Sequence, residues 1–331
     1  MPPLSPLLFF VLFLILWAEF VNGWTDAPNA IATVVSTRVL TPRKAVILAT
    51  LLNIAGAFSG TAVAVTIGTG IVKADIINLY TLAAAMVGII LWSTLAWKYG
   101  LPTSESHALI SGLAGAGFAA AGPQALLSEG WIKVGWGLVF STFIGYGLAY
   151  LLFVGIAWMF QRTPISRVRR TFGKLQIFSA AFMAFGHGSN DGQKFIGTFA
   201  LALLLAGVTQ QFTVPWWVIL LCASVMGIGT SIGGWRIIKT MGMNLTKLEP
   251  QHGFAAETAA ASAIEIASRM GIPLSTTHII NTSIMGVGSA QRRRGVRWGV
   301  AGNIVAAWLL TFPICAAIAF IVTKVLLLVF R

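Results

Sequence analysis

The chain has 331 residues, of which 57% are apolar and only 9% are charged, and its mean hydropathy is +0.84. Soluble domains carry about 25% charged residues, so this composition excludes a soluble globular enzyme and also a disordered chain. The apolar runs are long enough for membrane helices and too continuous for the alternating strands of a membrane β-barrel. We therefore predict an all-α polytopic membrane protein.

Ten apolar stretches, five in each half of the chain, are predicted to cross the membrane. The first 21 residues resemble the core of a signal peptide, but no basic segment precedes them, so we interpret them as part of a retained helix. The first and sixth stretches contain helix-breaking residues and are predicted to be interrupted. In chain order the stretches are 4–36, 44–70, 76–97, 104–121, 131–160, 172–206, 214–235, 253–270, 274–290 and 297–326.

The formal net charge of +13 has an explanation that involves no nucleic acid. Membrane proteins concentrate Lys and Arg in their cytoplasmic loops. Ten crossings with both termini outside place all four basic clusters in the cytoplasm, which supports a multi-pass plasma-membrane protein with its N-terminus outside. The clusters are Arg38, Arg43 and Lys44; Arg162, Arg167, Arg169, Arg170 and Lys174; Arg236, Lys239 and Lys247; and Arg292, Arg293, Arg294 and Arg297.

Two pairs of similar segments indicate an internal duplication. Residues 101–117 match 272–288 at an offset of 171, and residues 22–33 match 187–198 at an offset of 165. Because five crossings is an odd number, the second copy enters the membrane upside down, which is the pattern of secondary transporters. We predict two inverted repeats with interrupted helices and re-entrant segments at the midplane. The repeats are 1–160 and 175–331, joined by a basic cytoplasmic linker, 161–174.

Asp26 and Asp191 occupy equivalent positions in the shorter repeat, and each lies among glycine, proline or asparagine residues. A broken helix at membrane depth frees backbone carbonyl groups, which together with a carboxylate suit a hard cation such as Na⁺. The alternative is that both aspartates are N-caps of interrupted helices. Glu257 is also predicted to bind a cation, because it lies on an apolar span that leads into the second copy of the longer repeat.

The Pro-x-Ser-x-[Ser/Thr]-His segments of the longer repeat predict sites for an anion. Proline favours the first turn of a helix, where free backbone N–H groups and the helix dipole attract negative charge. Two such starts could hold one tetrahedral phosphate, although ordinary serine capping is the alternative. Nearby aspartates would repel phosphate unless a cation neutralised them, so anion binding would require Na⁺ or H⁺.

Three further polar residues in the apolar spans allow more than one interpretation. His107 and His278 are equivalent in the repeat, and we interpret them as packing residues that hold the helix starts in place. Lys194 follows Asp191 by three residues, so it could attract the anion or pair with the aspartate. Cys222 and Cys315 lie in apolar runs and predict neither a disulfide framework nor a metal cluster.

These motifs resemble those of the inorganic phosphate transporter (PiT) family. NGWTDAPNAIAT at 22–33 resembles the family signature G-A-N-D-x-x-N-A, with Thr25 in place of its asparagine, and GHGSNDGQKFIG at 186–197 resembles the second signature. PTSESHALI and PLSTTHIIN are similar to the family's serine-rich segments. The similarity covers nearly the whole chain. It implies phosphate symport with Na⁺ or H⁺ by alternating access, and a homodimer; no cofactor and no enzymatic activity are expected.

The resemblance and the residue patterns together give a set of site residues. For phosphate the set is Asp26, Ser104, Ser106, Asn190, Asp191, Gln193, Ser275, Thr276 and Thr277. For the coupling cation it is Asp26, Asn29, Asn190, Asp191 and Glu257, with Na⁺ placed at Asp26 and Asp191.

Three other functions remain open at this point. Relatives of the family also carry sulfate, which is tetrahedral like phosphate. An intramembrane enzyme acting on lipid phosphates would need one acid–base pair and gives no reason for symmetric copies. A passive anion channel would need a polar pathway but no paired acids. A nucleotide-driven pump is unsupported, because no Walker-type phosphate-binding motif is present.

Overall fold

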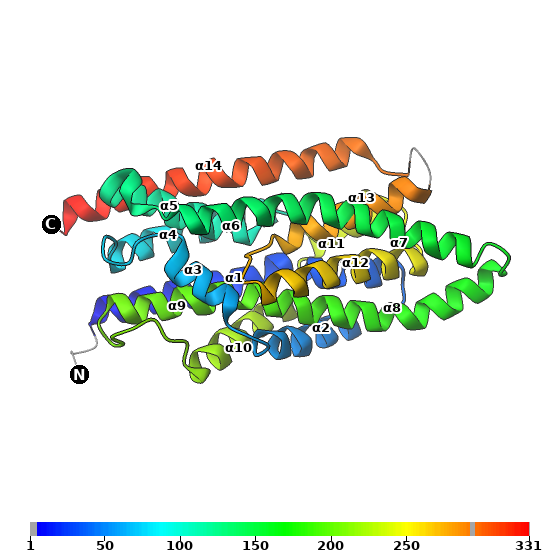
Figure 1. Ribbon diagram of the computed structural model, residues 1–331, viewed down its shortest axis with the longest axis horizontal. Coiled ribbons are helices and arrows are strands. Elements are labelled where there is room, and N and C mark those ends of the chain that lie inside the picture. Colours follow the sequence, from blue (N-terminus) through cyan, green and yellow to red (C-terminus); the bar gives the residue numbers. More distant parts are fainter. Residues whose placement is uncertain (1–4, 292–294, 331) are drawn as a thin grey trace.

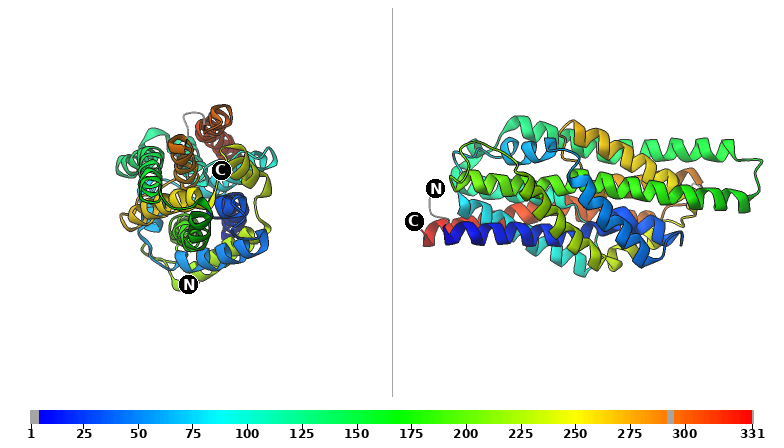
Figure 2. Two further views of the ribbon diagram at one scale, coloured as in Figure 1. Left: turned by 90° about the vertical axis from the view of Figure 1, so that its right-hand side faces the viewer. Right: turned by 90° about the horizontal axis from the view of Figure 1, so that it is seen from below.

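The computed structural model describes residues 5–291 and 295–330, and it shows an elongated bundle of helices. Seen along its long axis, most helices lie side by side (Figure 2). Within these ranges the only β-pairing is two isolated bridges, Val72–Leu126 and Thr246–Val296. The predicted all-α fold is confirmed. The basic residues Arg292, Arg293 and Arg294 of the fourth predicted cluster lie outside the described residues.

The helices of the two halves follow one another in a similar order. The first half contains α1 (Pro6–Ser36), α2 (Pro42–Ala57), α3 (Ala62–Gly70), α4 (Leu79–Lys98), α5 (Glu105–Ala121), the short η1 (Gly122–Ala125), α6 (Ser128–Val139), the π-helical η2 (Phe140–Ile144) and α7 (Gly145–Met159). The second contains α8 (Ile165–His187), the π-helical η3 (Gly188–Gly192), α9 (Gln193–Leu205), α10 (Trp216–Ile232), α11 (Trp235–Lys239), the π-helical η4 (Thr240–Asn244), α12 (Pro250–Arg269), α13 (Thr276–Gln291) and α14 (Trp298–Val329).

Helices occur at all ten predicted stretches, but they differ in length. By length and composition, four helical stretches within the described ranges could cross a membrane: α1, α4, Ser128–Met159 and α14. The bent pairs α2–α3 and α10–α11 raise that number to six. The helices α5 and α13 have 17 and 16 residues and begin directly after the buried residues Ser104 and Ser275, inside the bundle. They are about 25 Å long, less than the roughly 30 Å of a hydrocarbon core.

The predicted helix breaks at Asp26 and Asp191 are not where the chain is interrupted. α1 is continuous from Pro6 to Ser36, although Pro28 lies inside it. A proline removes only one backbone hydrogen-bond donor, and neighbouring helices and side chains can satisfy the carbonyl group that this leaves free. Around Asp191 the helix widens into the π-helical η3 without ending. The breaks lie instead between α2 and α3, which bend by 69°, and between α10 and α11, which bend by 61°.

Two of the basic loops are joined to neighbouring helix starts by contacts at one end of the bundle. The Arg169 guanidinium pairs with the Glu249 carboxylate at 2.6 Å, which joins the start of α8 to the start of α12. The hydrogen bond from Arg169 holds the pKa of Glu249 below the usual range. The backbone N–H of Arg297 donates to Leu245 O at 2.9 Å, which brings the loop before α14 to the same end. Residues 165–174 of the predicted linker already belong to α8.

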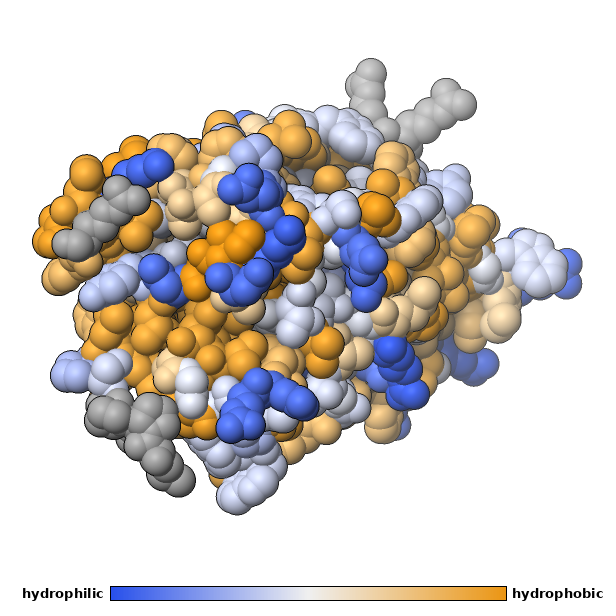
Figure 3. Space-filling view, turned by 60° about the vertical axis from the view of Figure 1, so that its left-hand side comes forward, coloured by the Kyte–Doolittle hydropathy of each residue, from blue (hydrophilic) through white to orange (hydrophobic). Residues whose placement is uncertain are grey.

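Both described ends of the chain lie at the opposite end of the bundle from the turn between α7 and α8 (Figure 1). The surface is broadly apolar, and the view in Figure 3 shows hydrophilic patches separated by large apolar areas. Trp216, Phe178 and Phe143 are each more than 70% exposed. A soluble protein rarely exposes such an area, and a lipid bilayer covers it in a membrane protein.

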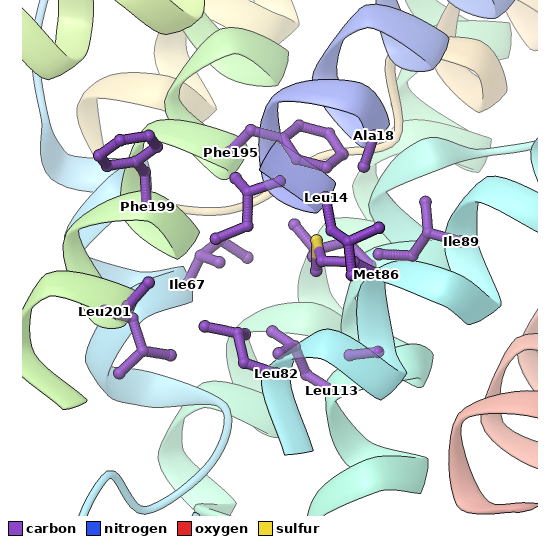
Figure 4. Close-up of a cluster of buried hydrophobic side chains, with 14 of the residues drawn as sticks. Leu14, Ala18, Ile67, Leu82, Met86, Ile89, Leu113, Phe195, Phe199 and Leu201 are labelled. Carbon is purple, nitrogen blue, oxygen red and sulfur yellow. The ribbon is translucent and has the colours of Figure 1, made fainter. Parts of the chain in front are cut away.

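An apolar cluster holds α1 against α3, α4, α5 and α9. Figure 4 shows Leu14 of α1, Met86 of α4, Leu113 of α5 and Phe195 of α9 pointing toward one another, and all four are buried. A second cluster packs the other end of α1 against α2, α8, α12 and α13. The middle of α1, which carries Asp26, is therefore held rigidly from both ends.

Gly115 allows α5 to pack directly on the backbone of α14. A Cβ atom at this position would lie 2.2 Å from Ala316 O and 2.6 Å from Ala316 Cα, so one of the helices would have to move. We expect Gly115→Ala to lower the free energy of unfolding by about 1–3 kcal/mol, the usual cost of overpacking. Thermal unfolding of the purified protein in detergent measures this.

Gly155→Ala is the matched control. A Cβ atom at Gly155, in α7, meets nothing within 4 Å, and alanine has the higher helix propensity. Equal melting temperatures for the two variants would contradict the close packing of α5 on α14.

Candidate functional site

The starts of α5 and α13 meet inside the bundle. Ser104 caps α5 by accepting a hydrogen bond from the His107 amide at 3.3 Å, and Ser275 accepts one from the His278 amide at 3.1 Å. The Ser275 hydroxyl also donates to Ser104 Oγ at 2.8 Å. Serine capping is thus correct for both residues, and the same hydroxyls join the two helix starts. The junction presents two positive dipole ends, which suit an anion.

Asp191 lies at this junction with both carboxylate oxygens engaged. It belongs to η3 and is 1% exposed. Its Oδ1 forms an ion pair with the Lys194 ammonium, while its Oδ2 accepts a hydrogen bond from the Thr276 hydroxyl at 2.6 Å. Its Oδ2 also lies 3.2 Å from His187 Nε2. Lys194 therefore pairs with the aspartate, which decides between the two interpretations of this lysine.

Asp26 approaches the same place from α1. One ligand atom each of Asp26, His187 and Asp191 lie within 4.8 Å of one another, so the three could share a metal ion. The Thr277 hydroxyl donates to Asp26 Oδ1 over a long 3.4 Å. The Asn29 amide donates to Thr277 Oγ1 at 2.9 Å. Since Asp26 is inside α1 and Asp191 inside η3, the N-cap interpretation is wrong for both.

The starts of α5 and α13 and the two aspartates Asp26 and Asp191 thus lie together inside the bundle. Eight of the predicted site residues are linked by the contacts around this junction: Asp26, Asn29, Ser104, Ser106, Asp191, Ser275, Thr276 and Thr277. We call this set, together with Lys194, the central cluster.

Asn190 and Gln193 are buried beside the central cluster, but their side chains bond elsewhere. The Asn190 amide donates to Ser268 Oγ at 2.9 Å in α12. The Gln193 carbonyl oxygen accepts a hydrogen bond from the Val63 amide at 3.0 Å at the start of α3. In this conformation both residues support the polypeptide around Asp191.

Glu257 has a separate polar environment. Its carboxylate accepts hydrogen bonds from the Thr33 hydroxyl of α1 at 2.5 Å, from the Gln176 amide of α8 at 3.0 Å and from the Ser179 hydroxyl of α8. The side chain is fully buried. Oxygen atoms from α1, α8 and α12 lie close together here, and oxygen atoms are the ligands that hard cations prefer.

Glu105 is a buried acid to which the sequence pattern assigned no role. It accepts hydrogen bonds from the Thr25 hydroxyl at 3.0 Å and from the Ser93 hydroxyl at 2.7 Å. Its position between Ser104 and Ser106, in a segment with no other charged residue, is the sequence signal that could have identified it.

His107 and His278 pack against each other, as interpreted from the sequence. Their ring centroids are 4.4 Å apart, and the His278 ring lies 3.8 Å from that of Trp308. Both are buried at the base of α5 and α13, where they fix the two helix starts.

The fold and the central cluster define a multi-pass membrane transport protein, in which buried carboxylate, ammonium and hydroxyl groups lie at the centre of an apolar bundle. Comparison with known families identifies the family: the model of the phosphate transporter family matches residues 22–167 and 161–319. The chain belongs to this family, and it is not an enzyme.

Known relatives are similar over most of their length. A probable low-affinity inorganic phosphate transporter of Rhizobium meliloti (strain 1021) is 46% identical over 95% of both chains. A protein of the same description from Bacillus subtilis (strain 168) is 41% identical over 94% of this chain and 95% of its own. A solved structure described as the sodium-dependent phosphate transporter has a TM-score of 0.89 at 24% identity, covering 98% of this chain and all of that one.

The contact between the two helix starts generates a stability prediction. Ser275→Ala removes the cap of α13 and the hydrogen bond to Ser104, so we expect a loss of about 1 kcal/mol in the free energy of unfolding. Thermal unfolding in detergent measures it. Ser111→Ala is the control, because the Ser111 hydroxyl donates to backbone carbonyl groups of its own helix, His107 O at 2.6 Å and Ala108 O, and caps no helix. The capping role fails if the control is equally destabilised.

Proposed function

We propose that the protein is a secondary symporter that moves inorganic phosphate across the plasma membrane, coupled to Na⁺ or H⁺, by alternating access. The observation that carries the proposal is the hydrogen bond between Ser275 and Ser104, beside Asp26 and Asp191. It supports a binding site that both halves of the chain build together. The descriptions of the relatives name phosphate, which supports phosphate over sulfate as the substrate.

Phosphate would bind at the two helix starts. The backbone N–H groups there and the hydroxyls of Ser104, Ser275 and Thr277 are donors, and a tetrahedral anion has acceptors on every side. The side chains of six of the predicted site residues now bond to the protein, so direct contact with phosphate would require them to exchange partners. They are Ser106, Asn190, Gln193, Ser275, Thr276 and Thr277. Such an exchange fits a protein that changes conformation during transport.

The negative charges at the central cluster explain why phosphate binding would require a coupling cation. Asp26, Asp191 and a phosphate would repel one another by several kcal/mol at about 4 Å and an intermediate effective dielectric. A cation at Asp26, with Asn29 and Asp191 close by, would remove that repulsion. Phosphate and cation then bind better together than alone, which is the thermodynamic basis of symport.

The order of the helices supports the inverted duplication. α1 corresponds to α8 with α9, the bent pair α2–α3 to α10–α11, α4 to α12, α5 to α13, and the long α6–α7 stretch to α14. In Figure 1, α1 runs from the end that holds the termini, whereas α8 starts from the opposite end. We propose repeats of 1–160 and 175–331 that rock about the central cluster.

The orientation and the assembly belong to the same proposal. The basic loops at one end of the bundle would face the cytoplasm, which places the N-terminus outside. The family resemblance implies a homodimer, and part of the apolar surface would then contact a second copy in place of lipid.

Phosphate uptake into proteoliposomes tests the function. We expect an imposed Na⁺ or pH gradient to drive accumulation of radiolabelled phosphate. Na⁺ is the first ion to test, because the solved relative of this fold is described as sodium-dependent. Asp26→Asn should reduce the accumulation at least tenfold, since it removes a charge that the coupling needs. Asp191→Asn should do the same, because it leaves the buried Lys194 ammonium without its partner. Asp75→Asn, in an exposed loop, is the control.

Excess unlabelled sulfate should not compete with phosphate. Uptake of sulfate in place of phosphate would overturn the substrate, and uptake that ignores both cation gradients would overturn the symport.

Glu257 provides a second test of the cation sites. We expect Glu257→Gln to raise the cation concentration needed for half-maximal uptake several-fold, because a neutral amide holds a cation less well than a carboxylate does. Glu265→Gln is the control on the same helix, where Glu265 pairs with the exposed Arg269. An unchanged cation dependence in Glu257→Gln would remove this residue from the cation-binding set and leave it a role in packing.

A further inference from the structure

Lys194 occupies the position that corresponds to Asn29 in the first copy of the repeat. Both residues follow the signature aspartate by three positions, and the matched segments are 165 residues apart. Asn29 and Lys194 are both buried. The duplication therefore has a neutral amide beside Asp26 and an ammonium group beside Asp191.

The contacts of these two residues are equivalent as well. The Asn29 amide donates to Thr277 Oγ1, and the Lys194 ammonium donates to Ser106 Oγ. Thr277 and Ser106 are themselves equivalent in the longer repeat, which has an offset of 171. In each half, the residue three positions after the aspartate therefore donates a hydrogen bond to a hydroxyl of the other half. This hydroxyl belongs to α13 for Asn29 and to α5 for Lys194.

The ammonium group of Lys194 uses all of its donors on protein oxygens. An ammonium has three N–H donors, and here three acceptors surround it: Asp191 Oδ1, Ser106 Oγ at 2.5 Å and Leu274 O at 2.9 Å. A carboxylate, a hydroxyl and a backbone carbonyl are also the oxygen ligands that a hard metal cation takes. No donor of Lys194 is left for a phosphate oxygen in this conformation.

The two aspartates consequently differ in their need for a cation. One oxygen of Asp191 pairs with the ammonium group of Lys194, a positive charge that belongs to the protein itself, and the other oxygen accepts a hydrogen bond from Thr276. None of the ion pairs among the described residues involves Asp26. Of the two aspartates in the central cluster, Asp26 is therefore the one without an ion-pair partner of its own.

We propose that Lys194 is a tethered cation that replaces a mobile coupling cation at Asp191, and so sets how many cations the protein needs for each phosphate. The proposal rests on the proposed function. The ammonium neutralises Asp191 permanently, and the mobile Na⁺ or H⁺ acts at Asp26. Lys194→Asn would place asparagine at the position that is equivalent to Asn29. Asp191 would then lack its ammonium partner and would require a mobile cation, as Asp26 does.

The test is phosphate uptake into proteoliposomes at fixed pH, with NaCl varied against choline chloride. We expect Lys194→Asn to depend more steeply on Na⁺ than the wild type does, with one more Na⁺ for each phosphate. The double variant Asp191→Asn with Lys194→Asn removes the carboxylate and its counter-charge together, so the uptake that it retains, although lower, should depend on Na⁺ no more steeply than uptake by the wild type does. Lys194→Arg retains the tethered charge and should also match the wild type.

Binding of radioactive sodium to the purified proteins, without phosphate, gives an independent readout that needs no transport. Lys194→Asn and Lys194→Gln should each bind one more Na⁺ than the wild type, and thermal unfolding identifies a variant that has lost its fold. A Lys194→Asn protein with unchanged Na⁺ binding and slope, but weaker affinity for phosphate, would overturn the proposal and make Lys194 a phosphate ligand. Wild-type protein that takes up no phosphate would instead overturn the proposed function.

Discussion

A charge removed from water and surrounded by apolar helices needs a partner, and this requirement determines the interior of the protein. Five carboxylates are nearly inaccessible: Glu19, Asp26, Glu105, Asp191 and Glu257. Their environments differ in kind. Glu257 and Glu105 are held by several neutral hydroxyl or amide donors, Glu19 by the Asn22 amide, Asp191 by an ammonium, and Asp26 by one long hydrogen bond. Of the two aspartates in the central cluster, Asp26 has the weaker compensation from the protein, so a mobile ion would stabilise it more.

The architecture supplies these partners by joining distant parts of the chain. The short helices α5 and α13 bring serine and threonine hydroxyls into the bundle, while α1 and η3 bring the aspartates. The donors and acceptors at the centre come from both halves, since Thr276 bonds to Asp191 and Thr277 to both Asp26 and Asn29. Movement of one half relative to the other would therefore alter the anion and cation environments at the same time.

Much of this organisation could be predicted from the sequence, because buried polar residues are rare in an apolar chain and are therefore easy to see. The repeated Asp26 and Asp191, the serine segments and the positions of the helices were found in that way. The continuity of α1 through Pro28 was not, since the local pattern does not show how tertiary contacts compensate for a lost backbone donor. The bonding of Gln193 to the start of α3, and of Glu105 to Thr25 and Ser93, depends on contacts between distant segments that no spacing reveals.

The ion pair between Lys194 and Asp191 has an electrical consequence. A mobile ion that crosses with its substrate gains or loses about 2.3 kcal/mol for each 100 mV of membrane potential. An ammonium on a lysine side chain stays with the protein and returns with it, so over a complete cycle it draws no energy from the voltage. A transporter built in this way concentrates its substrate less steeply, and it also depends less on how strongly the cell is energised.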